Sequence, residues 1–202
     1  MESRNKKLTQ ILVAIVLTIA GLSVAFAALS ATLNITTSSV KQNPVEWDVG
    51  FTGTSATPTE GGSSSVGRTC TNATVSKTQV TIASGIELSK PGDSCTYQLT
   101  IKNDGDIAAY LNSITPTAAT GTGVSCTTTA GSATTSAKLV CGNITYTLAG
   151  SANGNTNFVT GTTLNASQST TVYLIAAFTG TATASTQVTQ SGAAFAINYI
   201  QN

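Results

Sequence analysis

Residues 86–105 read IELSKPGDSCTYQLTIKNDG, and this stretch contains the clearest strand of the chain. Apolar and polar residues alternate through Tyr97–Ile101, which is the period of a strand with one buried face. The preceding Lys90-Pro91-Gly92-Asp93 is typical of a type II turn, because proline suits its second position and glycine its third. The stretch therefore predicts a turn, a half-buried strand and a second polar turn at Asn103-Asp104-Gly105-Asp106.

The same alternation recurs in other short runs, which are separated by further polar turns such as Asn153-Gly154. Many short strands joined by polar turns predict an all-β fold over residues 46–202, a two-sheet antiparallel sandwich of jelly-roll or Ig-like type. Residues 56–67, which are rich in Ser, Thr and Gly, are predicted to form a long exposed loop. The apolar residues of the other runs are Trp47, Val49 and Phe51; Val80 and Ile82; Ile144, Tyr146 and Leu148; Val172, Leu174, Ala176 and Phe178; and Phe195, Ile197 and Tyr199.

An apolar N-terminal segment precedes the predicted β domain. Three basic residues lie within the first seven positions, and no charged residue follows until Lys41. The run from Ile11 to Leu29 is long enough to cross a bilayer, and Ala25-Phe26-Ala27 supplies the small residues that signal peptidase accepts. The segment 1–27 is therefore predicted to be an apolar helix that serves as a signal peptide or a membrane anchor, so that the protein is exported to the cell surface or beyond.

Residues 28–45 are predicted to be an extended segment that follows the cleavage site. Leu29, Ala31, Leu33 and Ile35 alternate with polar residues and would share one face of a strand. This strand has two alternatives: it pairs within its own domain, or it completes the sheet of a neighbouring copy by β-augmentation. In the second case these four side chains fill pockets of the neighbour, and the repeated head-to-tail contact makes a filament.

Four cysteines occur at positions 70, 95, 126 and 141. An even number of cysteines in an exported chain predicts two disulfides, and the spacing matches no metal motif. Three pairings exist. The loop-like sequence between Cys126 and Cys141 favours a bond between these two, as between neighbouring strands, and Cys70 with Cys95 then follows by elimination.

The composition excludes several classes of function. Charged residues make up 8% of the chain and the net charge is +1, which argues against nucleic acid as a partner. The chain has no histidine, so it cannot build an H-E-x-x-H zinc site or a histidine-containing triad. Its carboxylates are scattered, and Asp104 and Asp106 suit an ordinary turn better than a calcium site. We therefore predict no enzyme, no catalytic residue, no cofactor and no bound metal.

Three segments together resemble the TasA/camelysin-type secreted proteins. They are Ala25-Phe26-Ala27-Ala28 after the apolar run, the turn sequence within Ile86–Ser94, and the strand Tyr97–Gly105. In that family a PGD turn leads into a strand that ends in N-x-G, and a late strand closes the sheet, as Phe195–Ile200 would here. The chain departs from the better-known fibre formers in its four cysteines, its shorter length and its low charge.

The resemblance implies a jelly-roll-like sandwich, secretion from a Gram-positive-type bacterium or an archaeon, and donor-strand assembly into biofilm-matrix or surface fibres. Camelysin-type members have been described as metallopeptidases, an activity that does not carry over to a chain without histidine. The sequence thus predicts a self-associating structural subunit. The alternative is a monomeric, membrane-anchored adhesive module of Ig-like type that binds a glycan or another partner through its loops. A type IV-pilin-like subunit ranks third, because the cleavage signature of such pilins is missing.

Overall fold

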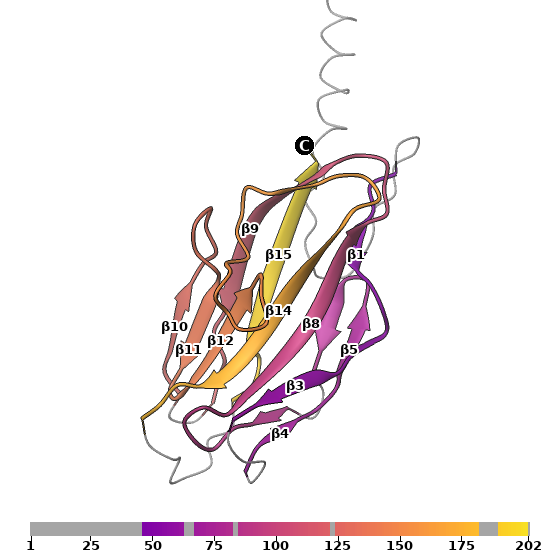
Figure 1. Ribbon diagram of the computed structural model, residues 1–202. Coiled ribbons are helices and arrows are strands. Elements are labelled where there is room, and N and C mark those ends of the chain that lie inside the picture. Colours follow the sequence, from indigo (N-terminus) through magenta and orange to yellow (C-terminus); the bar gives the residue numbers. More distant parts are fainter. Residues whose placement is uncertain (1–45, 63–66, 83–84, 122–123, 182–189, 202) are drawn as a thin grey trace, which may run out of the picture.

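The computed structural model describes residues 46–62, 67–82, 85–121, 124–181 and 190–201, and the regular structure of these residues is entirely β (Figure 1). The strands pair antiparallel throughout, so the predicted all-β antiparallel class is confirmed. The predicted N-terminal helix lies outside the described residues. The strands are β1 (Val49–Phe51), β2 (Ser55–Ala56), β3 (Pro58–Gly61), β4 (Thr69–Cys70), β5 (Ala73–Ser76), β6 (Gln79–Thr81), β7 (Ile86–Glu87), β8 (Ser94–Asn103), β9 (Ala109–Thr117), β10 (Cys126–Thr129), β11 (Lys138–Cys141), β12 (Ile144–Ala149), β13 (Thr163–Leu164), β14 (Ser169–Phe178) and β15 (Ala194–Gln201).

The largest sheet has seven strands in the order β1-β8-β14-β12-β11-β10, with β3 pairing beside β1 on β8. Strand β8, which was predicted from the alternation of Tyr97, Leu99 and Ile101, pairs with β1, β3 and β14, and these three residues are all buried. Leu99 lies opposite Val172 of β14, and both side chains face the core. The period-2 pattern therefore predicted the buried face of β8 correctly.

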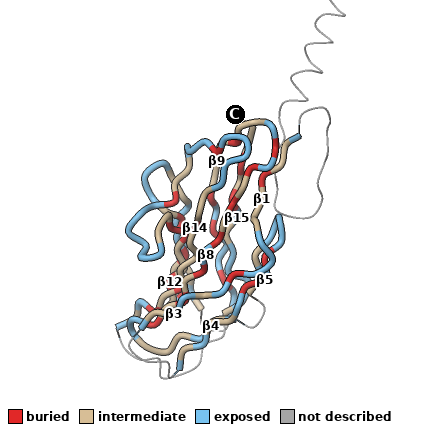
Figure 2. Tube along the Cα trace, turned by 45° about the vertical axis from the view of Figure 1, so that its right-hand side comes forward, coloured by how far each residue is buried: buried red, intermediate tan, exposed pale blue. Residues whose placement is uncertain are grey.

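A second, three-stranded sheet has the order β13-β9-β15. Leu111 and Ile114 of β9 and Ile197 and Tyr199 of β15 belong to the same hydrophobic cluster as the inward side chains of β8. The two sheets thus share one core. Figure 2 shows that the buried residues lie along the central strands, whereas the connecting loops are mostly exposed.

The remaining strands form two small sheets, β2-β5-β6 and β4-β7. Ala73 and Val75 of β5 are buried in the main core. Where the sequence predicted two sheets, the described strands divide into four hydrogen-bonded sheets. The five strands of the two small sheets are only two to four residues long.

Two further differences from the prediction concern strands β3 and β9. Strand β3 lies inside residues 56–67, the predicted exposed loop, because its backbone pairs with the first residues of β8. Strand β9 was not predicted at all. Its pairing with β15 shifts register next to Asn198, so that Leu111 and Ile114, three residues apart, are both buried. A bulge breaks the period of two on which strand prediction rests.

The turn before β8 has the predicted form. Gly92 has a φ of 90° and the Asp93 N–H donates to the carbonyl oxygen of Lys90 at 3.1 Å. The Asp93 side chain is fully buried and accepts hydrogen bonds from the N–H groups of Ser89 and Lys90, both at 3.1 Å. This carboxylate therefore stabilises the turn from inside the fold.

Candidate assembly edge

Strand β15 has a free edge within the part of the chain that the structure describes. It is eight residues long and pairs with β9 on one side only, at the end of the three-stranded sheet. The other ends of the two larger sheets are short strands: β10 has four residues, β1 has three and β13 has two. A long free edge presents a row of unpaired backbone donors and acceptors, which is where another strand adds most readily.

Glu46, the first described residue, lies at the same end of the domain as Gln201, the last residue of β15. Gln201 pairs with Ala109, the first residue of β9. Just before β9, the Asp106 N–H donates to the Glu46 carbonyl oxygen at 2.9 Å. Figure 1 shows the C-terminal end of β15 beside the connection from β8 to β9. The segment that precedes Glu46 therefore enters the domain where β15 ends.

The side chains of β15 alternate between core and surface. Ile197 and Tyr199 are buried in the main core, and Phe195 is partly buried against that core and against a smaller cluster of Ala119, Leu139 and Cys141. Asn198, between Ile197 and Tyr199, has a side-chain Oδ1 atom that is shielded from solvent and has no hydrogen-bond partner among the described residues. One face of β15 is thus part of the core, so a strand added at its free edge would extend that core with its own alternate side chains.

The proposed donor residues Leu29, Ala31, Leu33 and Ile35 lie outside the described residues. Their predicted role remains a prediction, as does the division of the chain at residues 27 and 45. The acceptor side was missed by sequence analysis. Strand β15 itself was predicted from Phe195, Ile197 and Tyr199, but no local signal indicates which strand stands at the end of a sheet.

Two disulfides join Cys70 to Cys95 and Cys126 to Cys141, which is the pairing favoured from the sequence. Cys126 and Cys141 are directly opposite each other on β10 and β11. The bond from Cys70 on β4 to Cys95 on β8 ties one of the small sheets to the largest sheet. Two disulfides are compatible with an exported protein in an oxidising environment.

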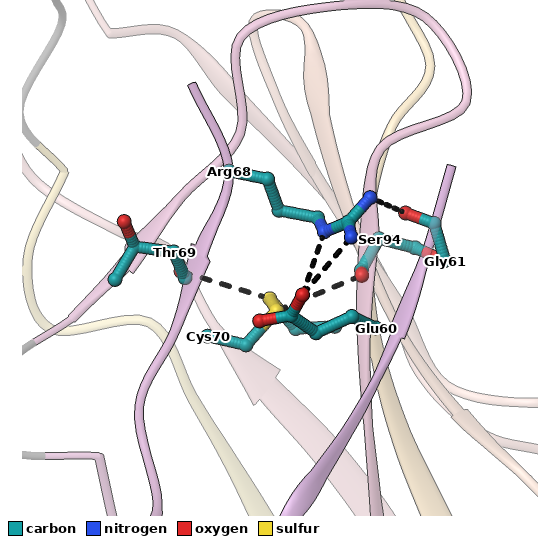
Figure 3. A network of polar contacts seen from close by, with 7 residues as sticks. Glu60, Gly61, Arg68, Thr69, Cys70 and Ser94 are labelled. Carbon is teal, nitrogen blue, oxygen red and sulfur yellow. Dashed lines mark hydrogen bonds and ion pairs between the residues drawn. A yellow bond between two sulfur atoms is a disulfide. The ribbon is translucent and has the colours of Figure 1, made fainter. Parts of the chain in front are cut away.

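An ion pair supports the same region. The Nη2 atom of Arg68 donates to Glu60 Oε2 at 2.9 Å, and its Nη1 atom donates to the Gly61 carbonyl oxygen at 2.8 Å (Figure 3). Glu60 lies opposite Cys95 in the pairing of β3 with β8. The disulfide and the ion pair therefore hold β3 and β4 next to β8. The edge of β8 in this region is already paired with β3.

The carboxylates form no metal site in the described part of the chain. Backbone pairing brings Glu46 and Asp48 next to Asp104 and Asp106, but no group of three or more ligating side chains there could hold an ion. Asp48 is paired with Lys77, and Asp104 is paired with Lys102. The described residues also contain no helix long and apolar enough to cross a membrane.

Burial raises the pKa of three tyrosines, Tyr97 to about 12 and Tyr146 and Tyr199 above the ordinary value. Tyr97 donates its hydroxyl hydrogen to the Thr71 carbonyl oxygen at 2.8 Å. All three hydroxyls therefore stay protonated at neutral pH.

Comparison with known proteins places the chain in no group: no protein family, curated protein or solved structure matches it. The resemblance to TasA/camelysin-type proteins accordingly rests on the quoted motifs alone.

Proposed function

We propose that this protein is an exported structural subunit of an extracellular surface or biofilm-matrix fibre, assembled by donor-strand β-augmentation. The observation that carries the proposal is the free edge of β15, which is eight residues long. In the assembly, Leu29–Thr36 of one copy adds to β15 of the next copy. The activity is structural, and no catalytic step is involved.

The lengths and patterns of the two strands support the pairing. Leu29–Thr36 is also eight residues long and alternates apolar and polar residues throughout. Added to β15, it places Leu29, Ala31, Leu33 and Ile35 on the core side, where burial of each large apolar side chain is worth about 1.5–3 kcal/mol. The three-stranded sheet then becomes four-stranded, which completes a two-sheet sandwich of jelly-roll type.

The position of the N-terminal segment supports contact between copies. The segment enters the domain at Glu46, at the end where β15 finishes. Residues 37–45 reach at most about 30 Å when extended, and β15 is about 26 Å long. From this end the segment can extend into a neighbour stacked on the domain, a contact that repeats without closing and so builds a filament.

Export follows from the N-terminal sequence and suits the two disulfides. The apolar run with its Ala-Phe-Ala site serves as a signal peptide, and its removal leaves the donor strand at a free N-terminus. The disulfides form in the oxidising environment that the protein reaches after export.

Electron microscopy of the chain without residues 1–27 tests the proposal. We expect filaments from this protein and from the Asn34→Asp variant, which places a charge on the polar face of the donor strand. The Leu33→Asp variant places the charge on the apolar face and is expected to remain monomeric. Filaments from Leu33→Asp would contradict the proposal. Monomers from all three proteins would instead favour a membrane-anchored binding module.

A further inference from the structure

A small cavity of about 220 Å³ is lined by residues of both larger sheets. Its wall combines the connection from β12 to β13, the short strand β13, the start of β14 and one side chain of β15. The residues that determine its chemistry are Phe158, Thr162, Thr163, Thr170 and Tyr199.

Tyr199 of β15 is one of the residues that line this cavity. It is only 5% exposed, and its hydroxyl group has no hydrogen-bond partner among the described residues. The hydroxyl oxygen is not among the polar atoms sealed from solvent. A buried tyrosine usually finds a partner for its hydroxyl group, because leaving it unpaired costs about 1–3 kcal/mol. The hydroxyl of Tyr199 is therefore available to a ligand.

Other hydroxyl groups in the wall are similarly available. Within the described part of the chain, Thr163 and Thr170 make no side-chain hydrogen bond, whereas Thr162 donates to the Val159 carbonyl oxygen at 3.3 Å. The wall contains no charged side chain, and Phe158 contributes an apolar surface. A cavity that offers hydroxyl groups, an aromatic ring and no charge suits a neutral, hydroxyl-rich ligand and gives an ion no compensation for its lost hydration.

We propose that this cavity binds one neutral sugar ring, with Tyr199, Thr163 and Thr170 as hydrogen-bonding residues. The volume is below the range of about 300–1,000 Å³ typical of drug-sized ligands, which fits a single ring rather than a longer segment of glycan. Tyr199 donates through its hydroxyl group, and the two threonines donate or accept. The site goes beyond the fibre function and gives each subunit a way to hold a neutral polysaccharide.

Saturation-transfer difference NMR on the full-length chain tests this site, because the method observes the sugar and tolerates large assemblies. The probes are glucose, galactose and N-acetylglucosamine, with glucuronate as the charged comparison. We expect saturable binding of at least one neutral sugar and none of glucuronate. The Tyr199→Phe variant removes only the hydroxyl group and is expected to weaken binding by about fivefold to tenfold.

Two further variants show whether a loss of binding comes from the cavity: one changes a second cavity residue, and the other changes a tyrosine outside it. Thr170→Val keeps the shape of its side chain, loses a hydroxyl group and should also weaken binding. Tyr146→Phe is the matched control, because the Tyr146 hydroxyl bonds to Gln190 Oε1 at 3.4 Å outside the cavity, and binding should stay unchanged. Absence of saturable binding of every neutral probe, or full binding by both Tyr199→Phe and Thr170→Val, would overturn the proposal. Filament formation is scored separately and does not depend on this outcome.

Discussion

The side-chain amide of Asn103 donates a hydrogen bond to the carbonyl oxygen of Leu164 at 3.0 Å, although the two residues are 61 positions apart. Asn103 ends β8 in the largest sheet, and Leu164 lies on β13 in the second sheet. The same amide donates to the Ile107 carbonyl oxygen at 2.7 Å, and Asn103 Oδ1 accepts from the Gly105 N–H at 3.1 Å. One fully buried side chain therefore holds the turn after β8 and joins the two sheets.

Replacement of Asn103 should destabilise the fold strongly. Asn103→Ala leaves two carbonyl groups and one N–H group without partners in a buried region, and we expect a loss of about 2–4 kcal/mol in the free energy of unfolding. Asn112→Ala is the matched control, because Asn112 is exposed on β9, and it should change the stability by less than about 0.5 kcal/mol. Urea denaturation measures both values. Equal stability of the two variants would show that the contacts of Asn103 contribute little.

The Asp93 carboxylate should contribute to the stability of the turn that starts β8. Asp93→Ala removes the acceptor for the N–H groups of Ser89 and Lys90, and the expected cost is about 2–3 kcal/mol. Asp93→Asn keeps one acceptor oxygen and should cost less. The exposed Asp106, substituted by alanine, serves as the control in the same denaturation experiment. A variant Asp93→Ala as stable as Asp106→Ala would contradict this role.

Each disulfide should stabilise the domain by restricting the unfolded chain. The bonds span sequence separations of 15 and 25 residues, for which loop-closure entropy predicts about 3 kcal/mol each. Replacement of both partners by serine, in Cys126/Cys141 or in Cys70/Cys95, should lower the free energy of unfolding by this amount. Peptide mapping of the unreduced protein checks the connectivity, and a fragment that links Cys70 to Cys126 would refute it.

Stability should fall at alkaline pH because of the buried tyrosines. The pKa of Tyr97 is raised from 10 to about 12 by burial, so the folded state favours the protonated form. The contribution of Tyr97 to the free energy of unfolding is about 2–3 kcal/mol. It is complete below pH 10 and is lost as the pH rises from 10 towards 12. Urea denaturation across this interval should show the decline, and the Tyr97→Phe variant should show a shallower one. An identical slope in the variant would assign the decline to other groups.

Assembly should protect the backbone of β15 against hydrogen exchange. If the donor strand adds to the free edge, amides of Ala194–Gln201 exchange more slowly in filaments than in the monomeric Leu33→Asp variant. Strand β10, the edge strand Cys126–Thr129 of the other sheet, provides the internal comparison and should exchange equally in both states. Protection of β10 without protection of β15 would place the contact between subunits at β10 and would contradict the proposal.

The close approach of two backbone segments explains why a glycine follows Asn103 in the motif N-x-G. Gly105 is buried, and a Cβ atom there would lie 2.7 Å from the Asp48 backbone nitrogen and closer still to the Glu46 carbonyl oxygen. The sequence marks a turn at this place through its Asn, Asp and Gly residues. Only the folded structure shows that the glycine makes room for the chain entering the domain.

By itself, the sequence determined the features that depend on neighbouring residues. The period of two predicted the buried face of β8 and the long strands β14 and β15, and the Pro-Gly pair predicted the turn at residues 90–93. Tertiary structure decided the features that depend on pairing between distant segments. Leu111 and Ile114 are both buried because β9 bulges against β15, and the edge of β15 is free because no described strand lies beyond it. Backbone hydrogen bonds between strands use the same donor and acceptor groups whatever the side chains are. Neither the order of the strands nor a free edge can therefore be predicted from local sequence.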